Sequence, residues 1–392
     1  CRVLGGGTCS KSRSLGIVID TEHRDFQTSQ QIGAAINRRM HSFRTGTKEG
    51  VATPKTDQYV ELRVHPRYKD NVGRYVRVVR NIAFKETPTD RHERIELLAR
   101  QLADPVTAAA AALRLEAIGS DAIETLTEAI TAADQDPEVM FYAAEALAYL
   151  DVTDAVAPLA AAGLAEPAFR PHALVAISAM DDAVARDALR ELLGATSAET
   201  RYGAFRALTA MHADDPLIRG EDLKGQFSYH VLDVGGPPMI HVTRSYRPEI
   251  ALFGRGHHFK LPISVDAGSH IMVNGLKGSE VTVSRFAPKM PDEKRVVSTS
   301  VDAVIRAIVE LGGTYPDVVQ ALIEAERTGG LSCRLRVDAV PESGRPFARS
   351  PGAETATVEG GSVVPSMAAP VPHLFRRLRT RQFGVERGSA PS

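Results

Sequence analysis

The pattern of hydrophobic and polar positions divides the chain into three parts. In the middle, over residues 104–213, apolar residues recur at helical spacing in four copies that begin roughly 30 residues apart, an interval typical of stacked helix pairs. Each copy opens on residues that suit a helix start, because Asp and Ser accept hydrogen bonds from free N–H groups and Pro fits the first turn. The openings are Asp104-Pro105, Asp136-Pro137, Glu166-Pro167 and Ser197-Ala198.

An Ala-rich helix follows each opening, and its small face allows neighbouring helices to approach while Leu, Ile and Met fill the core. These helices are expected around residues 112–118, 144–150, 173–180 and 204–211. Partner helices are expected over 121–132, 153–162 and 182–193, and a helix over 93–102 would cap the array. The pairs resemble HEAT-type repeats, which present an extended surface to protein partners; the alternative is a spacer.

Both flanks of the array combine strands and helices. The first flank predicts strand 15–20, helix 28–40, a loop over 45–55, strand 59–65 and helix 71–82. The second predicts strands at 227–233, 239–244, 249–253, 261–265, 270–273, 280–286 and 335–340, with helices 301–311 and 315–327. From Pro341 on, Pro, Gly, Ser and Ala dominate, a composition that indicates disorder.

The fold class is therefore α+β, with mixed α/β flanks interrupted by an all-α, HEAT-like solenoid. The expected domains are 1–88, 89–219, 220–341 and a disordered tail 342–392. Each flank alone has too few strands for a sheet that buries both faces. We therefore expect the flanks to fold together across the insertion, and a chain lacking the repeats to keep a folded α/β core.

Composition excludes several classes of function. The formal net charge of −1 gives no reason to expect binding to nucleic acid, and no apolar run reaches the roughly 18 residues of a membrane span. The exception is a short basic run at 375–381, which is either a solvated tail or a binding patch. Cys1, Cys9 and Cys333 lack metal-ligand spacing; Cys9 and Cys333 are either a disulfide or free thiols.

The chain begins with Cys1 and has no initiator Met. We expect that something has been removed upstream, either a cleaved signal peptide or a missing stretch of protein. A lipid-modified Cys1 is a further alternative.

Candidate chemical motifs are few. Gly5-Gly6-Gly7 lacks the spacing of a phosphate-binding loop, and no Gly-x-Ser-x-Gly elbow occurs. The nearest metal-ligand candidates are His230, His241, His257 and His258, for which ordinary surface or loop positions are expected. The carboxylate pairs Asp181-Asp182 and Asp214-Asp215 lie at helix boundaries, where Asp serves as a cap. We predict no catalytic, cofactor-binding or metal-binding residues, and no enzyme.

The flanks taken together resemble the bacterial flagellar P-ring protein family. The resemblance rests on residues 15–19, 25–37 and 60–66 in the first flank, and on 247–254 and 301–331 in the second. The last block is the most specific, because it matches the closing helix pair of the family, with Leu311-Gly312-Gly313 between the helices. Three features depart from the family: the repeats, a missing N-terminal portion, and the lack of an Asn-Glu-Arg-Thr-Gly run.

The resemblance implies a structural protein of the periplasm and the flagellar basal body. It implies a homo-oligomeric ring around the flagellar rod, acting as a bushing for motility, with rod and L-ring proteins and peptidoglycan as partners and no cofactor. The alternative is a HEAT-repeat adaptor that binds a periplasmic or cell-wall protein. A third possibility, an enzyme regulated by its solenoid, would need a pocket with perturbed titratable groups. Self-assembly separates the first reading from the second.

Overall fold

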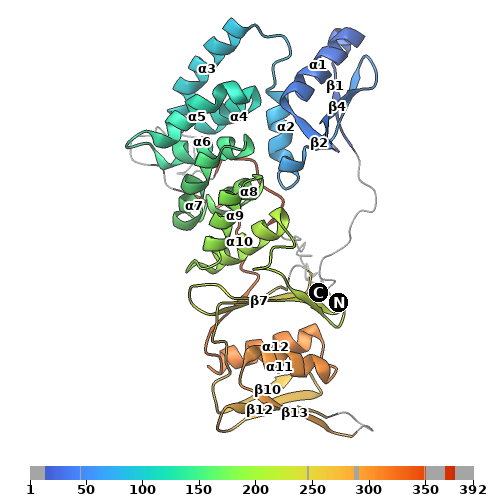
Figure 1. The fold of residues 1–392 in the computed structure, drawn as a ribbon, viewed down its shortest axis with the longest axis vertical. Helices are drawn as coiled ribbons and strands as arrows, with labels where there is room; N and C mark the ends of the chain where they lie inside the picture. The colour runs from blue at the N-terminus through green and yellow to red at the C-terminus, as the bar shows by residue number, and fades with distance from the viewer. Residues whose placement is uncertain are drawn as a thin grey trace, which may run out of the picture.

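The computed structural model describes residues 14–44, 46–244, 247–286, 291–347, 349 and 367–375. The expected α+β class is confirmed: a run of packed helices lies between mixed and antiparallel sheets. Figure 1 shows an elongated molecule. The first block (14–86) lies beside the N-terminal half of the solenoid, and the second block (220–340) lies at the opposite end of the long axis.

The first block is a small antiparallel sheet covered by helix α1. Its elements are β1 (Leu15–Val18), η1 (Thr21–His23), α1 (Phe26–Arg39), β2 (His41–Arg44), β3 (Thr47–Gly50), β4 (Ala52–Pro54), β5 (Tyr59–Leu62), η2 (Pro66–Tyr68) and α2 (Val72–Arg80). The sheet order is β1-β5-β4, with β2-β3 as a separate hairpin. The prediction of a loop over 45–55 was therefore wrong. Asn37 on α1 fixes β4 instead, because its side chain bonds both the N–H and the carbonyl oxygen of Ala52, at 2.7 and 2.8 Å.

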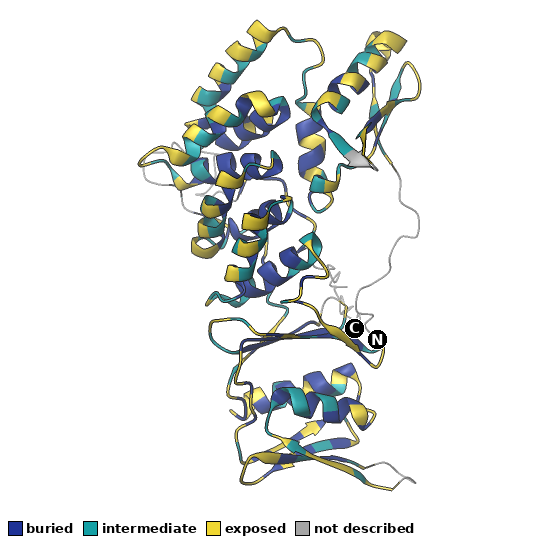
Figure 2. Cartoon of the chain, viewed as in Figure 1, coloured by how far each residue is buried: buried dark blue, intermediate teal, exposed yellow. Residues whose placement is uncertain are grey.

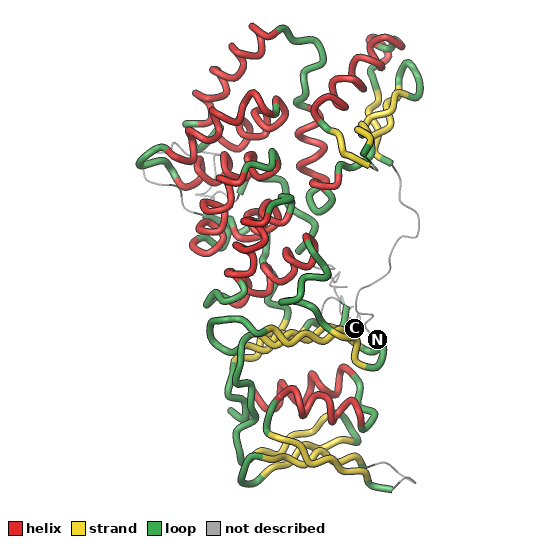
Figure 3. The backbone as a smooth tube through the Cα atoms, viewed as in Figure 1, coloured by secondary structure: helices red, strands yellow, loops and turns green. Residues whose placement is uncertain are grey.

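The solenoid consists of two layers of helices. The inner layer holds α4 (Ala108–Ile118), α6 (Pro137–Tyr149), α8 (Arg170–Ser178) and α10 (Ala198–Met211). The outer layer holds α3 (Pro88–Leu102), α5 (Ile123–Thr131), α7 (Val156–Ala165) and α9 (Ala183–Leu192), with short turns η3 (Ser120–Ala122) and η4 (Thr153–Ala155). Figures 2 and 3 show these layers, with the inner helices buried and the outer helices exposed on one side.

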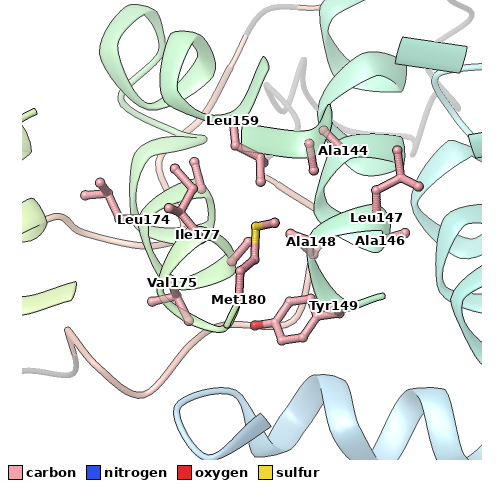
Figure 4. Packing of buried hydrophobic residues seen from close by; sticks show 14 of the residues in the cluster. Ala144, Ala146, Leu147, Ala148, Tyr149, Leu159, Leu174, Val175, Ile177 and Met180 are labelled. Atoms are coloured by element: carbon pink, nitrogen blue, oxygen red, sulfur yellow. The ribbon is translucent and has the colours of Figure 1, made fainter. Parts of the chain in front are cut away.

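Alanine explains how closely the inner helices pack. Every residue of α8 is buried, and nearly every residue of α6. Figure 4 shows Met180 between Ile177 and the small side chain of Ala148, with the ring of Tyr149 beside Met180 and Ala148. Small residues let the helix axes approach, and the larger ones fill the remaining space at the density of a protein interior.

The second block has three layers (Figure 1). A five-stranded sheet of order β14-β8-β9-β7-β6 and a four-stranded antiparallel sheet of order β10-β11-β12-β13 enclose two helices. The elements are β6 (Glu221–Leu223), β7 (Phe227–Leu232), β8 (Met239–Val242), β9 (Glu249–Phe253), β10 (Ile263–Ala267), β11 (Ile271–Gly275), β12 (Glu280–Arg285), β13 (Glu293–Ser298), α11 (Val301–Glu310), α12 (Tyr315–Arg327) and β14 (Arg334–Val337). The second block thus has a core of its own, built from both sheets and both helices.

The two flanks do not form one sheet. Strand β5 belongs to the sheet of the first block and β9 to the five-stranded sheet, and among the described residues no strand pairs across the two blocks. The prediction that the flanks fold together was wrong. The solenoid separates the blocks, and its core continues onto the adjacent face of the five-stranded sheet, where Leu232, Met239 and Phe253 are buried. Removing the repeats would expose that face, so a folded core without them is not expected.

The prediction of a disordered tail was also wrong for the residues that the structure describes. Residues 341–347, 349 and 367–375, which we call the strap, lie along the inner layer of the solenoid and reach the first block (Figure 1). Phe347, Met367, Ala369 and Phe375 are buried in the same core as the helices. Composition could not reveal this, because the apolar surface that orders the strap comes from distant helices.

Candidate functional site

The joint between the first block and the solenoid is a buried ionic cluster. Arg74 on α2 is about 1% exposed and lies between Glu116 on α4 and Glu145 on α6, with ion-pair distances of 2.6 and 2.5 Å. Tyr68 donates to Glu116 at 2.6 Å, and its ring stacks on Tyr149 at 4.8 Å. Burial alone would lower the pKa of Arg74, but the two carboxylates raise it. Burial raises the pKa of Glu145, against the opposing effect of Arg74.

The joint between the solenoid and the second block uses a different set of groups. Arg201 on α10 donates to the carbonyl oxygens of Leu193 at 2.7 Å and Gly235 at 3.0 Å, and also to that of Pro237. Its guanidinium lies 5.2 Å from the centroid of the Phe253 ring. Burial lowers the pKa of Arg201 to about 10.

A buried carboxylate completes the second joint. Glu249 on β9 accepts a hydrogen bond from the Tyr202 hydroxyl at 2.7 Å and from Arg206 at 3.4 Å. The ring of Tyr202 stacks on His241 with 3.5 Å between centroids. These polar groups belong to the packing of α10 on the sheet.

The four candidate histidines occupy separate structural positions. The expectation of surface or loop positions was wrong for His241, which is buried on β8. His257 lies in a loop but is also buried, because other parts of the fold cover it. His230 bonds the carbonyl oxygen of Ile218 at 2.8 Å, and His257 bonds that of Phe253 at 3.1 Å. His241 accepts from the N–H of Ala339 at 3.0 Å, and burial lowers its pKa to about 3. The backbone of His258 bridges Ser300. Within the described ranges no group of three or more His, Cys, Asp or Glu side chains is arranged to hold a metal ion.

A cleft of about 780 Å³ lies between the first block and the repeats. Basic side chains from both sides line it, among them Arg67, Lys69 and Arg186, together with Asp151 and the predicted carboxylate pair Asp181-Asp182. Two of the basic side chains are engaged: Arg67 pairs with Asp151 at 2.7 Å, and Lys69 donates to the carbonyl oxygen of Ala210 at 2.6 Å. The cleft is a charged seam between two bodies.

One carboxylate of each pair, Asp182 and Asp215, acts in a helix start or turn. Asp182 accepts from the N–H of Val184 at 2.6 Å as the N-cap of α9, and Asp151 accepts from the N–H of Asp181 at 3.0 Å. Asp215 accepts from the N–H of Leu217 at 3.0 Å and pairs with Arg190 at 2.7 Å. Side chains already used in this way are poor candidates for general acids or bases.

The remaining candidates from the sequence can be placed only in part. Cys333 is a half-buried free thiol, and burial raises its pKa to about 11, which makes it a poor nucleophile at neutral pH. Cys1, Cys9, the triplet Gly5-Gly6-Gly7 and all of the basic run except Phe375 lie outside the described residues. Among the described helices none is long and apolar enough to cross a membrane.

The sequence analysis missed the strap. Arg345 forms two hydrogen bonds with Glu199 on α10, at 2.6 and 2.8 Å, and Arg349 forms two with Glu138 on α6, at 2.7 and 3.2 Å. Between them Phe347 packs on Phe169, with 5.6 Å between ring centroids. The signal was present, since Arg, Phe and Arg alternate in an otherwise small and polar segment.

The far end of the strap lies on α6 and the first block. The N–H of Ala368 donates to the Tyr142 hydroxyl at 2.9 Å, the Asn71 side chain donates to the carbonyl oxygen of Pro370 at 3.3 Å, and the N–H of His373 donates to that of Asp70 at 2.7 Å. The described residues of the strap therefore contact the inner helices α10, α8 and α6 as well as the first block.

Comparison with known proteins gives no relative for this arrangement. No protein-family model, curated protein or solved structure matches the chain.

Proposed function

We propose that the chain is a structural, non-catalytic subunit of the periplasmic P ring of the bacterial flagellum, where it assembles into a homo-oligomeric ring around the rod. One observation carries the proposal: residues 301–331, the segment most similar to the P-ring family, provide the central layer of the second block as α11 and α12. A capping box between Thr314 and Asp317 fixes the start of α12.

The open edges of the second block support a subunit that joins its neighbours head to tail. Among the described strands β10 and β13 each pair on one side only, so the four-stranded sheet ends in two different edges. Contacts between two different surfaces of identical copies generate closed rings when the rotation closes. The β13 edge carries the charged residues Glu293, Lys294 and Arg295. Charged residues at a sheet edge commonly prevent unspecific strand pairing.

The test uses the gene in its own organism. Deletion should abolish swimming while protein export stays intact, and the tagged full-length protein should be present in purified basal bodies. A deletion strain that swims normally, together with a protein that stays out of basal bodies, overturns the proposal.

The second candidate function is an adaptor. It is favoured by the surface of α10, α8 and α6 that the strap covers, which we call the groove. Arrays of helix pairs use such surfaces to bind extended partners. A chain that stays monomeric in cells and co-purifies with one cell-wall protein through this groove would support the adaptor over the ring subunit.

A further inference from the structure

The strap contacts the solenoid in step with its repeats. Glu138, Phe169 and Glu199 follow one another at intervals of about 30 positions, the period of the helix pairs. Glu138 and Glu199 lie in the first turn of α6 and α10, and Phe169 is the N-cap residue of α8. Three successive repeats therefore contact the strap through residues at or near the start of their inner helix.

The strap meets these positions with every second residue. Arg345 contacts the repeat of α10, Phe347 that of α8 and Arg349 that of α6, so the strap runs antiparallel to the order of the repeats. Alternate residues of an extended chain point to the same side. Arg345, Phe347 and Arg349 thus offer one side chain to each of three repeats, the spacing expected of an extended Arg-x-Phe-x-Arg segment.

Burial gives the contact its specificity. The Glu138 side chain is about 3% exposed, and Phe347 about 6%. Phe347 extends a row of rings, since Phe169 stacks on Phe141 at 4.7 Å. Arg170 adds a second cation to Glu199 at 3.1 Å. An empty groove would leave the Glu138 carboxylate without its cation and uncover the Phe169 ring, whereas Glu199 would keep Arg170, so the groove is stabilised by an occupant.

We propose that this groove, across α10, α8 and α6, is a binding site for an extended Arg-x-Phe-x-Arg segment, and that in the assembled protein the segment comes from a neighbouring copy of the chain. The second half rests on the proposed ring function. Within one isolated chain the strap fills its own groove, because a linked segment has a high effective concentration. In an assembly every neighbour offers an identical segment, and its exchange is a low-cost route to association.

Charge reversal separates exchange from closure within one chain. The strap variant carries Arg345→Glu and Arg349→Glu, and the groove variant carries Glu199→Arg and Glu138→Arg, both in the full chain. Neither variant can close on itself, because like charges face each other, yet each matches the other. We expect a 1:1 complex on mixing, measured by light scattering after size exclusion, and none from either variant alone. A chain with all four substitutions should close on itself and ignore both.

Two folded variants that stay monomeric when mixed, at the highest concentration that remains in solution, overturn the exchange. If the groove variant does not fold, the site is tested with the full-length strap variant alone, by measuring the binding of a labelled peptide of residues 341–350. The peptide should bind that variant and not the native chain. Replacing its Phe by Ala, or inserting one Ala between Phe and the second Arg, should weaken binding about tenfold.

No binding of the peptide to a folded strap variant overturns the site itself. The outcome is distinguishable from a failure of the proposed function, because these assays measure the groove in solution, whereas the ring is tested by motility and by the content of basal bodies. A positive peptide result with a swimming deletion strain would keep the site and remove the ring.

Discussion

At its first-block end the solenoid buries Arg74 between two glutamates, whereas at its second-block end it buries Arg201 among backbone carbonyl groups, and no described carboxylate pairs with Arg201. In the first joint one cation balances two acids. In the second joint Arg201 bonds neutral carbonyl oxygens. Glu249 instead accepts from the neutral Tyr202 and from the partly exposed Arg206. The first joint should therefore depend on charge, and the second on geometry and desolvation.

The largest expected effect is at Arg74. Arg74→Met leaves Glu116 and Glu145 buried without their cation, and breaking a buried pair in this way costs about 3–5 kcal/mol. The free energy of unfolding from urea titration measures the loss. The matched control is Arg255→Met, since Arg255 and its partner Asp233 are exposed and such pairs contribute little to stability. Equal losses in the two variants would refute the ionic account of the first joint.

A smaller loss is expected from the corresponding change in the second joint. Arg201→Met removes hydrogen bonds to carbonyl oxygens but also removes a buried charge without an ionic partner, so we expect a cost of about 1–3 kcal/mol. The same urea titration applies. A loss as large as that of Arg74→Met would show that the two joints do not differ as proposed.

The second joint should also weaken in acid. The folded-state pKa of His241 is lowered to about 3 from an ordinary 6.5, so its contribution is complete above pH 6.5 and is lost as the pH falls below that value. Between pH 6.5 and 5.0 the loss is about 2 kcal/mol. The groups around it are Tyr202, Ala339, Asp338 and Arg206.

The measurement compares the stability of the native chain and of His241→Gln at several pH values. The variant should lose about 2 kcal/mol less over this range. Burial lowers the pKa of His172 to about 3 as well. His172→Gln is therefore the control, because it removes a buried histidine that lies outside the second joint. Identical pH profiles of His241→Gln and the native chain would contradict the prediction.

The smallest effect is expected at Glu145, and its sign is opposite. Because burial raises the folded-state pKa of Glu145 above 4.5, the native protein loses stability as the pH rises through that raised value. Glu145→Gln should remove this loss and be slightly more stable than the native chain at neutral pH. Glu116→Gln should be less stable, since Glu116 accepts from both Arg74 and Tyr68. A destabilised Glu145→Gln would indicate that the cluster needs both charges.

Local pattern predicted most of the elements, because it depends on neighbours in the sequence. Strand β9 was predicted at its observed bounds, and α12 likewise, since a capping box and Pro316 define its start. The missed strands β6 and β13 are short or charged edge strands. In β13 the residues Glu293, Lys294 and Arg295 lack the apolar alternation by which a half-buried strand is recognised.

Long-range placement could not be predicted in the same way. The separation of the flanks depends on α10 covering one face of the five-stranded sheet, and the order of the strap depends on Phe169, Glu138 and Glu199 from three different repeats. The expected surface positions were wrong for His241 and His257, which are buried, because their burial depends on distant parts of the fold. The expected capping role is seen for Asp182. The joints around Arg74 and Arg201 were missed, because a buried arginine is indistinguishable from a surface one in a single sequence.

The spacing of the strap residues differs slightly from the spacing of the repeats that they contact. Two extended residues advance at most about 7 Å, whereas packed helices lie about 8–10 Å apart, so each further repeat adds a mismatch of a few Å. Phe347 contacts the middle repeat, and the longer side chains of Arg345 and Arg349 span the distance to the outer two. A fourth matched position would exceed that reach. The mismatch therefore limits the length of the segment that this groove can bind. An array with more of the same repeats would not bind a longer peptide.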